Sequence, residues 1–174
     1  MSATNLIPDT ISLIGMPGAG KSTIGVILAK LSGLRFTDTD LDIQVHANAT
    51  LQQILEKEGY LRLRAIEQEV LLAVPLHHSV IATGGSVVYS AAAMARLKAA
   101  GPVVYLEADL PTLQQRVSAA PLRGIACAKA QRYPDIFAER TLLYRQYADI
   151  KVDACDGSPE TVAGEILTCL ATSS

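Results

Sequence analysis

Short apolar runs alternate along the chain with longer segments in which apolar residues recur at helical spacing. The runs predict five strands, at 11–14, 34–38, 79–83, 103–106 and 150–152. The segments predict helices at 50–58, 60–74, 90–99, 111–119, 134–147 and 159–170, and one after the first strand with Ile24, Ile27, Leu28 and Leu31 on one face, ending at Gly33. Because nearly continuous apolar strands alternate with helices, the pattern predicts an α/β fold whose parallel sheet is covered on both faces. Ligands bind at the carboxyl ends of the strands in such a sheet.

Composition narrows the class of protein. The 174 residues suit a single domain, 1–174, and a monomer is the default expectation at this size. The net charge of -2 gives no basic footprint, so we expect no nucleic-acid partner. No apolar run approaches the roughly 20 residues that cross a bilayer, and the first nine residues do not resemble a secretory signal. Three cysteines without metal-ligand spacing favour reduced thiols in a cytoplasmic protein, and His46, His77 and His78 are expected at the surface.

The strongest motif is the glycine-rich loop Gly15-Met16-Pro17-Gly18-Ala19-Gly20-Lys21-Ser22, which follows the first strand and has Thr23 beside it. It matches the complete P-loop pattern, in which backbone N–H groups and a helix N-terminus bind phosphate oxygens. Lys21 would reach the β- and γ-phosphates, and the Ser22 hydroxyl would ligate Mg²⁺. A plain glycine-rich turn is the alternative. The pattern predicts ATP and Mg²⁺ binding, and the absence of an Asn/Thr-Lys-x-Asp signature argues against a GTPase.

Two aspartates, Asp38 and Asp40, follow the second strand. On extended backbone their carboxylates would project to one side, where one serves the magnesium shell and the other holds an acceptor hydroxyl. The alternative is that Asp40 caps a helix that begins at Leu41.

The helix at 60–74 carries Arg64 and Glu67 on one face. An arginine fork suits a substrate carboxylate, and a nearby glutamate can fix its rotamer; an exposed ion pair is the alternative. The third strand ends in Thr83-Gly84-Gly85-Ser86, where a ligand could lie directly on the backbone unless the glycines form only a tight turn.

The stretch from Arg116 to Arg140 is rich in arginine for this sparsely charged chain. Pro121-Leu122-Arg123-Gly124 is typical of part of a mobile flap, and Glu139-Arg140 lies on the helix at 134–147. Anionic substrates need such cations, although isolated surface arginines usually bind nothing specific.

Taken in order, these motifs resemble the shikimate kinase family from Ile11 to about Leu170. The markers are 15–22, Phe36 to Asp40, Arg64-Ala65-Ile66-Glu67, Ala82-Thr83-Gly84-Gly85, Arg123 and Glu139-Arg140-Thr141-Leu142-Leu143-Tyr144, the last similar to the family's Glu-Arg-x-Pro-Leu-Tyr. The resemblance implies a three-layer α/β/α P-loop kinase fold, like that of nucleoside-monophosphate kinases, with a five-stranded parallel sheet and a mobile lid at roughly 118–132. It also implies transfer of the γ-phosphoryl group of ATP to the 3-hydroxyl of shikimate, in aromatic amino-acid biosynthesis.

The resemblance assigns the acceptor site by matching positions. Lys21, Asp40 and Arg123 would be the catalytic residues, with Asp40 as the general base. Arg64 and Arg140 would hold the shikimate carboxylate, Gly84 and Gly85 would form the backbone floor, and Glu67 would orient Arg64.

The nucleotide site is assigned in the same way. ATP would be bound by Gly18, Ala19, Gly20, Lys21, Ser22 and Thr23, with Arg123 over the phosphates. Arg116 would stack on the adenine, and the loop from Cys155 to Pro159, including Gly157, would flank its other side. Ser22 and, mostly through water, Asp38 would hold Mg²⁺.

Three positions depart from the family pattern: Ser86 stands where a third glycine is usual, 123–126 read Arg-Gly-Ile-Ala in place of Arg-Pro-Leu-Leu, and Gln44 replaces a common glutamate. The first two bear on the acceptor floor and the lid. The alternatives are therefore another small-metabolite kinase of this fold, gluconate-like or nucleoside-monophosphate, or a non-catalytic nucleotide-binding regulator.

Overall fold

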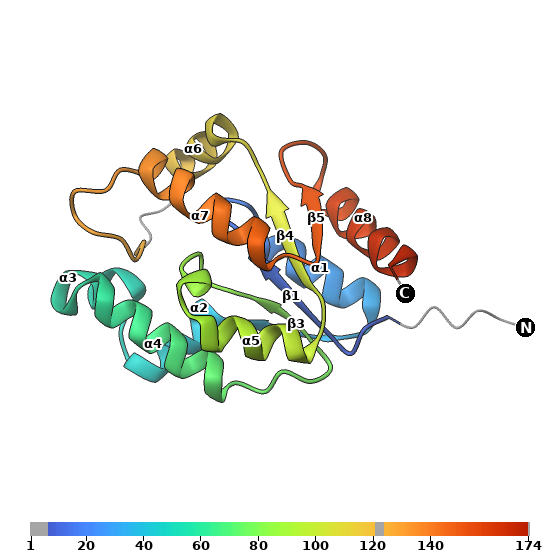
Figure 1. Cartoon of the computed structure of the whole chain (residues 1–174), viewed down its shortest axis with the longest axis horizontal. Helices are drawn as coiled ribbons and strands as arrows, with labels where there is room; N and C mark the ends of the chain where they lie inside the picture. Colours follow the sequence, from blue (N-terminus) through green and yellow to red (C-terminus); the bar gives the residue numbers. More distant parts are fainter. Residues whose placement is uncertain (1–6, 121–123, 174) are drawn as a thin grey trace, which may run out of the picture.

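Five parallel strands form one sheet in the order β2-β3-β1-β4-β5 (Figure 1). The computed structural model describes residues 7–120 and 124–173. The strands are β1 (Thr10–Ile14), β2 (Arg35–Asp38), β3 (Ser79–Ala82), β4 (Val103–Glu107) and β5 (Ile150–Asp153), which confirms all five predicted strands. The chain places β2 and β3 on one side of β1, and β4 and β5 on the other. This change of side opens a crevice at the carboxyl end of β1.

Helices cover both faces of this sheet, giving three layers (Figure 1). They are α1 (Lys21–Ser32), α2 (Thr39–Ala47), α3 (Leu51–Glu58), α4 (Tyr60–Ala73), α5 (Ala91–Ala100), α6 (Leu110–Ala119), α7 (Tyr133–Tyr147) and α8 (Pro159–Thr172), with a 3₁₀ helix η1 (Val87–Tyr89). Helices α1 and α8 pack together on one face, while α5 and α7 contact β1 and β4 from the other. None of the helices in the described ranges is long and apolar enough to cross a bilayer.

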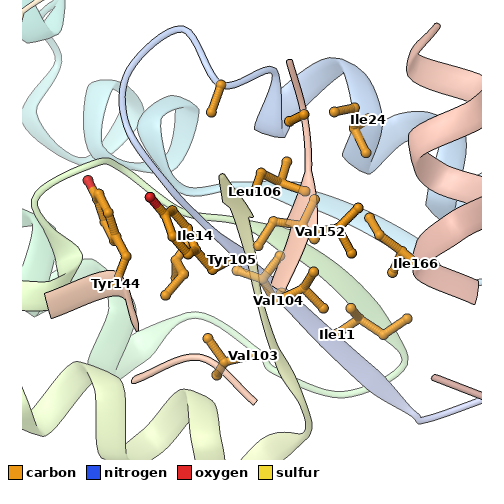
Figure 2. Packing of buried hydrophobic residues seen from close by; sticks show 14 of the residues in the cluster. Ile11, Ile14, Ile24, Val103, Val104, Tyr105, Leu106, Tyr144, Val152 and Ile166 are labelled. Carbon is orange, nitrogen blue, oxygen red and sulfur yellow. The ribbon is translucent and has the colours of Figure 1, made fainter. Parts of the chain in front are cut away.

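The main core lies between the sheet and these helices, where β1 and β4 are buried along nearly their whole length. Figure 2 shows Ile11 close to Val104 and Ile166, and Ile14 close to Tyr105. The rings of Tyr105 and Tyr144 stack beside them, with centroids 5.2 Å apart. Close packing of this kind holds the strand ends, and the loops that leave them, in fixed positions.

A smaller core joins α2, α3 and α4 through Ile43, Ile54, Leu63, Ile66 and Val70. Ala126, from the segment that precedes α7, is buried in the same cluster. The segment also lies against the start of α3, since a Cβ on Gly124 would come within 2.6 Å of the backbone of Leu51. Residues 124–126 are therefore packed onto the cluster of α2, α3 and α4, in which α2 and α4 carry residues predicted for the acceptor site.

The geometry expected at the second strand end is wrong in one respect. Asp40 does not lie on extended backbone but in the first turn of α2, a helix that was considered only as the alternative. That alternative placed the cap at Asp40 and the helix start at Leu41, two residues too late in each case. The cap of this helix is Asp38, whose carboxylate accepts a hydrogen bond from the backbone N–H of Asp40 at 3.0 Å. A short polar side chain at this place satisfies a helix donor that would otherwise be unpaired, and this fixes where α2 begins.

Candidate active site

The P-loop connects the buried end of β1 to the N-terminus of α1. Gly20 has φ 93°, a left-handed conformation that glycine adopts without strain, and the next residue begins the helix. The ammonium group of Lys21 is buried and donates to the carbonyl oxygens of Gly15 at 2.7 Å and Met16 at 3.0 Å. The loop thus curls around a lysine, in front of a helix N-terminus whose partial positive charge favours an anion.

The two predicted metal ligands are brought together. The hydroxyl of Ser22, in the first turn of α1, donates to Oδ2 of Asp38 at the end of β2 at 2.6 Å. A hydroxyl and a carboxylate are the hard oxygen ligands that Mg²⁺ takes, and Mg²⁺ usually completes its shell with water and substrate phosphates. The described residues hold no group of three or more His, Cys, Asp or Glu side chains placed for a metal ion, so an all-protein metal cage is not present among them.

Gly84 lies at the point where two carboxylates meet. A Cβ at this position would be 2.2 Å from Oε1 of Glu67 and 3.0 Å from Oδ1 of Asp40. The next glycine is enclosed as well, because a Cβ on Gly85 would be 3.0 Å from Nη1 of Arg140. The carbonyl of Gly85 accepts a hydrogen bond from the buried hydroxyl of Tyr144. Glycine is required at both positions because neighbouring atoms approach so closely. The predicted role of the two glycines as a backbone floor for the acceptor stays a prediction.

Glu67 is a buried carboxyl, with 4% of its surface exposed. Burial raises its pKa to about 7; the Ser86 hydroxyl, which donates to Oε2, acts in the opposite direction, as do the charges of Arg140 and Lys21, while Asp40 adds to the rise. Its Oε1 has no hydrogen-bond partner among the described residues, and Glu67 contributes to the lining of the cleft. Ser86 therefore supplies a donor that a glycine could not.

Arg64 and Arg140 converge on one backbone oxygen. The Nε and Nη2 of Arg64 donate to the carbonyl of Ala126 at 3.3 and 3.1 Å, and Nη2 of Arg140 donates to the same atom at 2.8 Å. The Arg64–Glu67 ion pair considered from the sequence is not formed between these described side chains. Arg140 is 1% exposed, and its Nε has no partner within the described chain. The pair forms a cationic clamp, for which a carboxylate is the matching anion.

Arg116 donates hydrogen bonds both to the P-loop and to the loop after β5. Its guanidinium donates to the carbonyls of Ala154 at 2.7 Å, Cys155 at 3.1 Å and Gly18 at 3.4 Å. Gly157 follows in the same loop with φ 88°. The predicted contacts of Arg116 and Gly157 with adenine stay predictions. Arg116 lies on α6 and lines the cleft, and Gly157 lies in the loop that Arg116 contacts.

One cleft of about 380 Å³ joins the two halves of the site. It is lined by most of the predicted residues: Gly18, Gly20, Lys21, Ser22, Thr23, Asp40, Glu67, Gly84, Gly85, Arg116 and Arg140. Ala19, Asp38, Arg64 and Gly157 lie outside its lining, and Arg123 lies outside the described residues.

Three residues of the candidate active site were not identified from the sequence. The hydroxyl of Tyr133 donates to the carbonyl of Pro17 in the P-loop, and Tyr89 lies against the clamp arginines. Ala126 contributes only a carbonyl. The scarcity of aromatic residues, 5% of the chain, is a signal that could have directed attention to the two tyrosines, whereas a backbone acceptor such as that of Ala126 leaves no sign in the sequence.

A parallel sheet with a P-loop at its switch point, facing an arginine clamp beside two carboxylates, defines a phosphotransferase for a small acidic acceptor. The family model "Shikimate kinase" matches residues 17–171. Shikimate kinase 2 of Enterobacter sp. (strain 638) is 38% identical over 165 residues, covering 92% of this chain and 94% of that protein. The chain belongs to the shikimate kinase family.

Solved structures agree with this assignment. The shikimate kinase of Acinetobacter baumannii in complex with shikimate superposes with a TM-score of 0.85 at 32% identity, covering 98% of this chain and 97% of the other. The Aquifex aeolicus shikimate kinase gives a TM-score of 0.80 at 31% identity, with 94% and 96% covered. The three-layer P-loop kinase fold with five parallel strands is thereby confirmed.

Proposed function

We propose that this shikimate kinase holds the carboxylate of shikimate between Arg64 and Arg140 while Asp40 binds the hydroxyl that receives the γ-phosphoryl group of ATP. The chain is an enzyme of the aromatic amino-acid pathway by its family membership. The single observation that carries the residue assignment is the convergence of both guanidinium groups on the Ala126 oxygen. A neutral carbonyl occupies the point at which two cations meet, and an anionic oxygen would bind there more strongly.

The acceptor would therefore replace the Ala126 carbonyl at the clamp. Its ring would lie over Gly84 and Gly85, which line the cleft. Hydroxyl groups on the ring would then face Asp40 and the unpartnered Oε1 of Glu67. Support for this orientation comes from chemistry, since cations lie at one end of the floor and carboxylates at the other.

The P-loop would hold ATP with its γ-phosphoryl group toward Asp40. Lys21 lies in the loop, and the hydroxyl of Ser22 together with Asp38 would bind Mg²⁺. When bound, Mg²⁺ neutralises phosphate charge. Arg123 would close over the phosphates, and we retain the expectation that Arg123→Ala lowers kcat on the order of 10³-fold.

Positioning supplies most of the catalysis in this scheme. Phosphoryl transfer through a loose transition state needs an aligned hydroxyl and charge stabilisation more than a strong base. Asp40 would align the hydroxyl and accept its proton late. The enzyme is proposed to act as a cytoplasmic monomer without nucleic-acid or membrane partners.

A coupled assay of ADP release tests the proposal, with shikimate, gluconate and nucleoside monophosphates compared in parallel. We expect ADP release with shikimate alone among these acceptors, and its abolition in Asp40→Asn. Equal rates with gluconate or a nucleotide would contradict the acceptor assignment, and equal ADP release without any acceptor would indicate an ATPase.

A further inference from the structure

Tyr89 lies against both arginines of the clamp. The Cζ atom of Arg64 is 3.8 Å from the centroid of the Tyr89 ring, and that of Arg140 is 5.4 Å from it. The ring of Tyr60 approaches the Arg64 guanidinium as well, at 5.0 Å. Cations within about 6 Å of a ring centroid are attracted by the negative face of the ring. One aromatic side chain thus interacts with two cations that belong to different helices.

The ring is itself held in place. Tyr89 ends the 3₁₀ helix η1, which follows the glycine floor directly, and its backbone N–H donates to the carbonyl of Ser86 at 3.1 Å. Its hydroxyl donates to Oε1 of Glu139, the neighbour of Arg140 on α7. With a fixed backbone and an anchored hydroxyl, the half-buried ring has little freedom to turn.

Stacking determines which atoms of Arg64 remain available. A ring on the face of a planar guanidinium fixes its plane and leaves the N–H groups at its edge free to donate. Those edge groups, Nε and Nη2, are the ones that meet the Ala126 oxygen. An unstacked arginine has several rotamers of similar energy, and binding an anion would have to restrict them.

We propose that Tyr89 is a positioning residue that holds Arg64 and Arg140 in the geometry that binds the acceptor carboxylate. This inference rests on the proposed function, because it assigns the anion at the clamp to the acceptor. Tyr89 acts on binding through the two arginines, and it takes no part in the transfer of the phosphoryl group. Removal of the ring therefore raises the KM for shikimate and leaves kcat and the KM for ATP nearly unchanged.

The test compares Tyr89→Leu, Tyr89→Phe and the parent enzyme in steady-state kinetics. Loss of the ring is expected to raise the KM for shikimate by about 3- to 30-fold, the range that corresponds to a partly buried cation–π contact. Tyr89→Phe keeps the ring and should restore most of the affinity. Tyr147→Leu, a partly buried tyrosine about two turns beyond Arg140 on α7, is the matched control and should behave as the parent.

Two readouts separate positioning from a general structural effect. The methyl ester of shikimate lacks the anionic group, so its KM should be the same in Tyr89→Leu and the parent. The Arg64 Nε–Hε proton, assigned by its loss in Arg64→Lys, should show an upfield ring-current shift in the parent and in Tyr89→Phe that disappears in Tyr89→Leu. If Tyr89→Leu does not fold, Tyr89→Met provides a bulky side chain without a ring for the same measurements.

A KM for shikimate in Tyr89→Leu within about twofold of the parent overturns the inference, as does an equal rise of the KM for the ester. A parent enzyme that releases no ADP with shikimate would refute the proposed function instead. In that case the chemical shift of the Arg64 Nε–Hε proton tests the inference about Tyr89. A shift that is the same in Tyr89→Leu and the parent overturns it.

Discussion

Arg64 on α4 and Arg140 on α7 donate hydrogen bonds to one and the same backbone oxygen, that of Ala126. Two guanidinium groups repel each other, and one of these is almost completely buried. The Ala126 carbonyl lies between their edges, and the Tyr89 ring lies beside both groups. The site is therefore organised around a point at which an anionic oxygen is the favoured occupant.

The clamp predicts that Arg64→Lys impairs acceptor binding more than catalysis. Lysine keeps the charge but loses the planar fork that donates through two edge nitrogens. We expect the KM for shikimate to rise by about tenfold or more, with a smaller change in kcat, in steady-state assays at saturating ATP. Arg62→Lys is the matched control, since Arg62 lies two residues away and pairs with Glu58 and Glu69 at the surface. Equal effects of the two substitutions would remove Arg64 from the clamp.

The close contacts of Gly84 predict that a single added methyl group at this position lowers both stability and activity. Gly84→Ala would place a Cβ 2.2 Å from the Glu67 carboxylate, so either the floor or Glu67 must move. Overpacking of this kind costs about 1–3 kcal/mol of stability, and we expect shikimate-dependent activity to fall at least tenfold with it. Gly164→Ala in α8 is the control, because a Cβ there meets no atom within 4 Å. That control should be stabilised by up to about 1 kcal/mol in thermal unfolding.

Glu67 predicts a pH dependence of stability. Burial raises its pKa to about 7 from 4.5, so between these pH values the folded protein keeps a proton that the unfolded chain has lost. This contribution to stability is complete below pH 4.5 and is lost as the pH rises through 7, a difference on the order of 3 kcal/mol.

Glu67→Gln removes this proton equilibrium. In chemical denaturation of the ligand-free protein, the free energy of unfolding of Glu67→Gln relative to the parent should improve between pH 5 and pH 8. A relative stability that does not vary with pH would show that Glu67 is ionised in the folded protein throughout this range.

The hydrogen bond from Ser86 predicts the direction in which the pKa of Glu67 changes when the Ser86 hydroxyl is removed. Its hydroxyl donates to the Glu67 carboxylate and so lowers the pKa of Glu67 from the value that burial alone would give. Ser86→Ala should therefore raise the pKa of Glu67, measured from the ¹³C chemical shift of its carboxyl carbon, with Glu67→Gln serving to assign the resonance. A pKa that stays constant or decreases in Ser86→Ala would exclude the hydrogen bond.

Much of the fold could be predicted because the central strands β1, β3 and β4 are buried and mostly apolar, whereas the edge strands β2 and β5 are partly exposed and were recognised from short apolar runs. Helix α2 was considered only as an alternative because its residues carry little helical pattern, with Leu41 59% and Val45 81% exposed and Ile43 buried. Its capping residue, Asp38, was interpreted only as a metal ligand. The same carboxylate contacts both Ser22 and the helix N-terminus, so the two interpretations do not exclude each other.

Within the site, motif spacing identified the side chains but not all of their partners. Arg64 and Glu67 share a helix face, yet packing directs one to Ala126 and the other to Ser86. The contact of Tyr89 depends on a three-residue 3₁₀ helix that tertiary packing places beside α7. Local sequence contains no information about such long-range contacts, because the partners lie on separate elements.

A crystal structure with shikimate and a non-hydrolysable ATP analogue tests the central claim most directly. We expect the carboxylate between Arg64 and Arg140 where the Ala126 carbonyl now lies, and a ring hydroxyl within hydrogen-bond distance of Asp40. Shikimate bound elsewhere, with both arginines still on the Ala126 oxygen, would contradict the account.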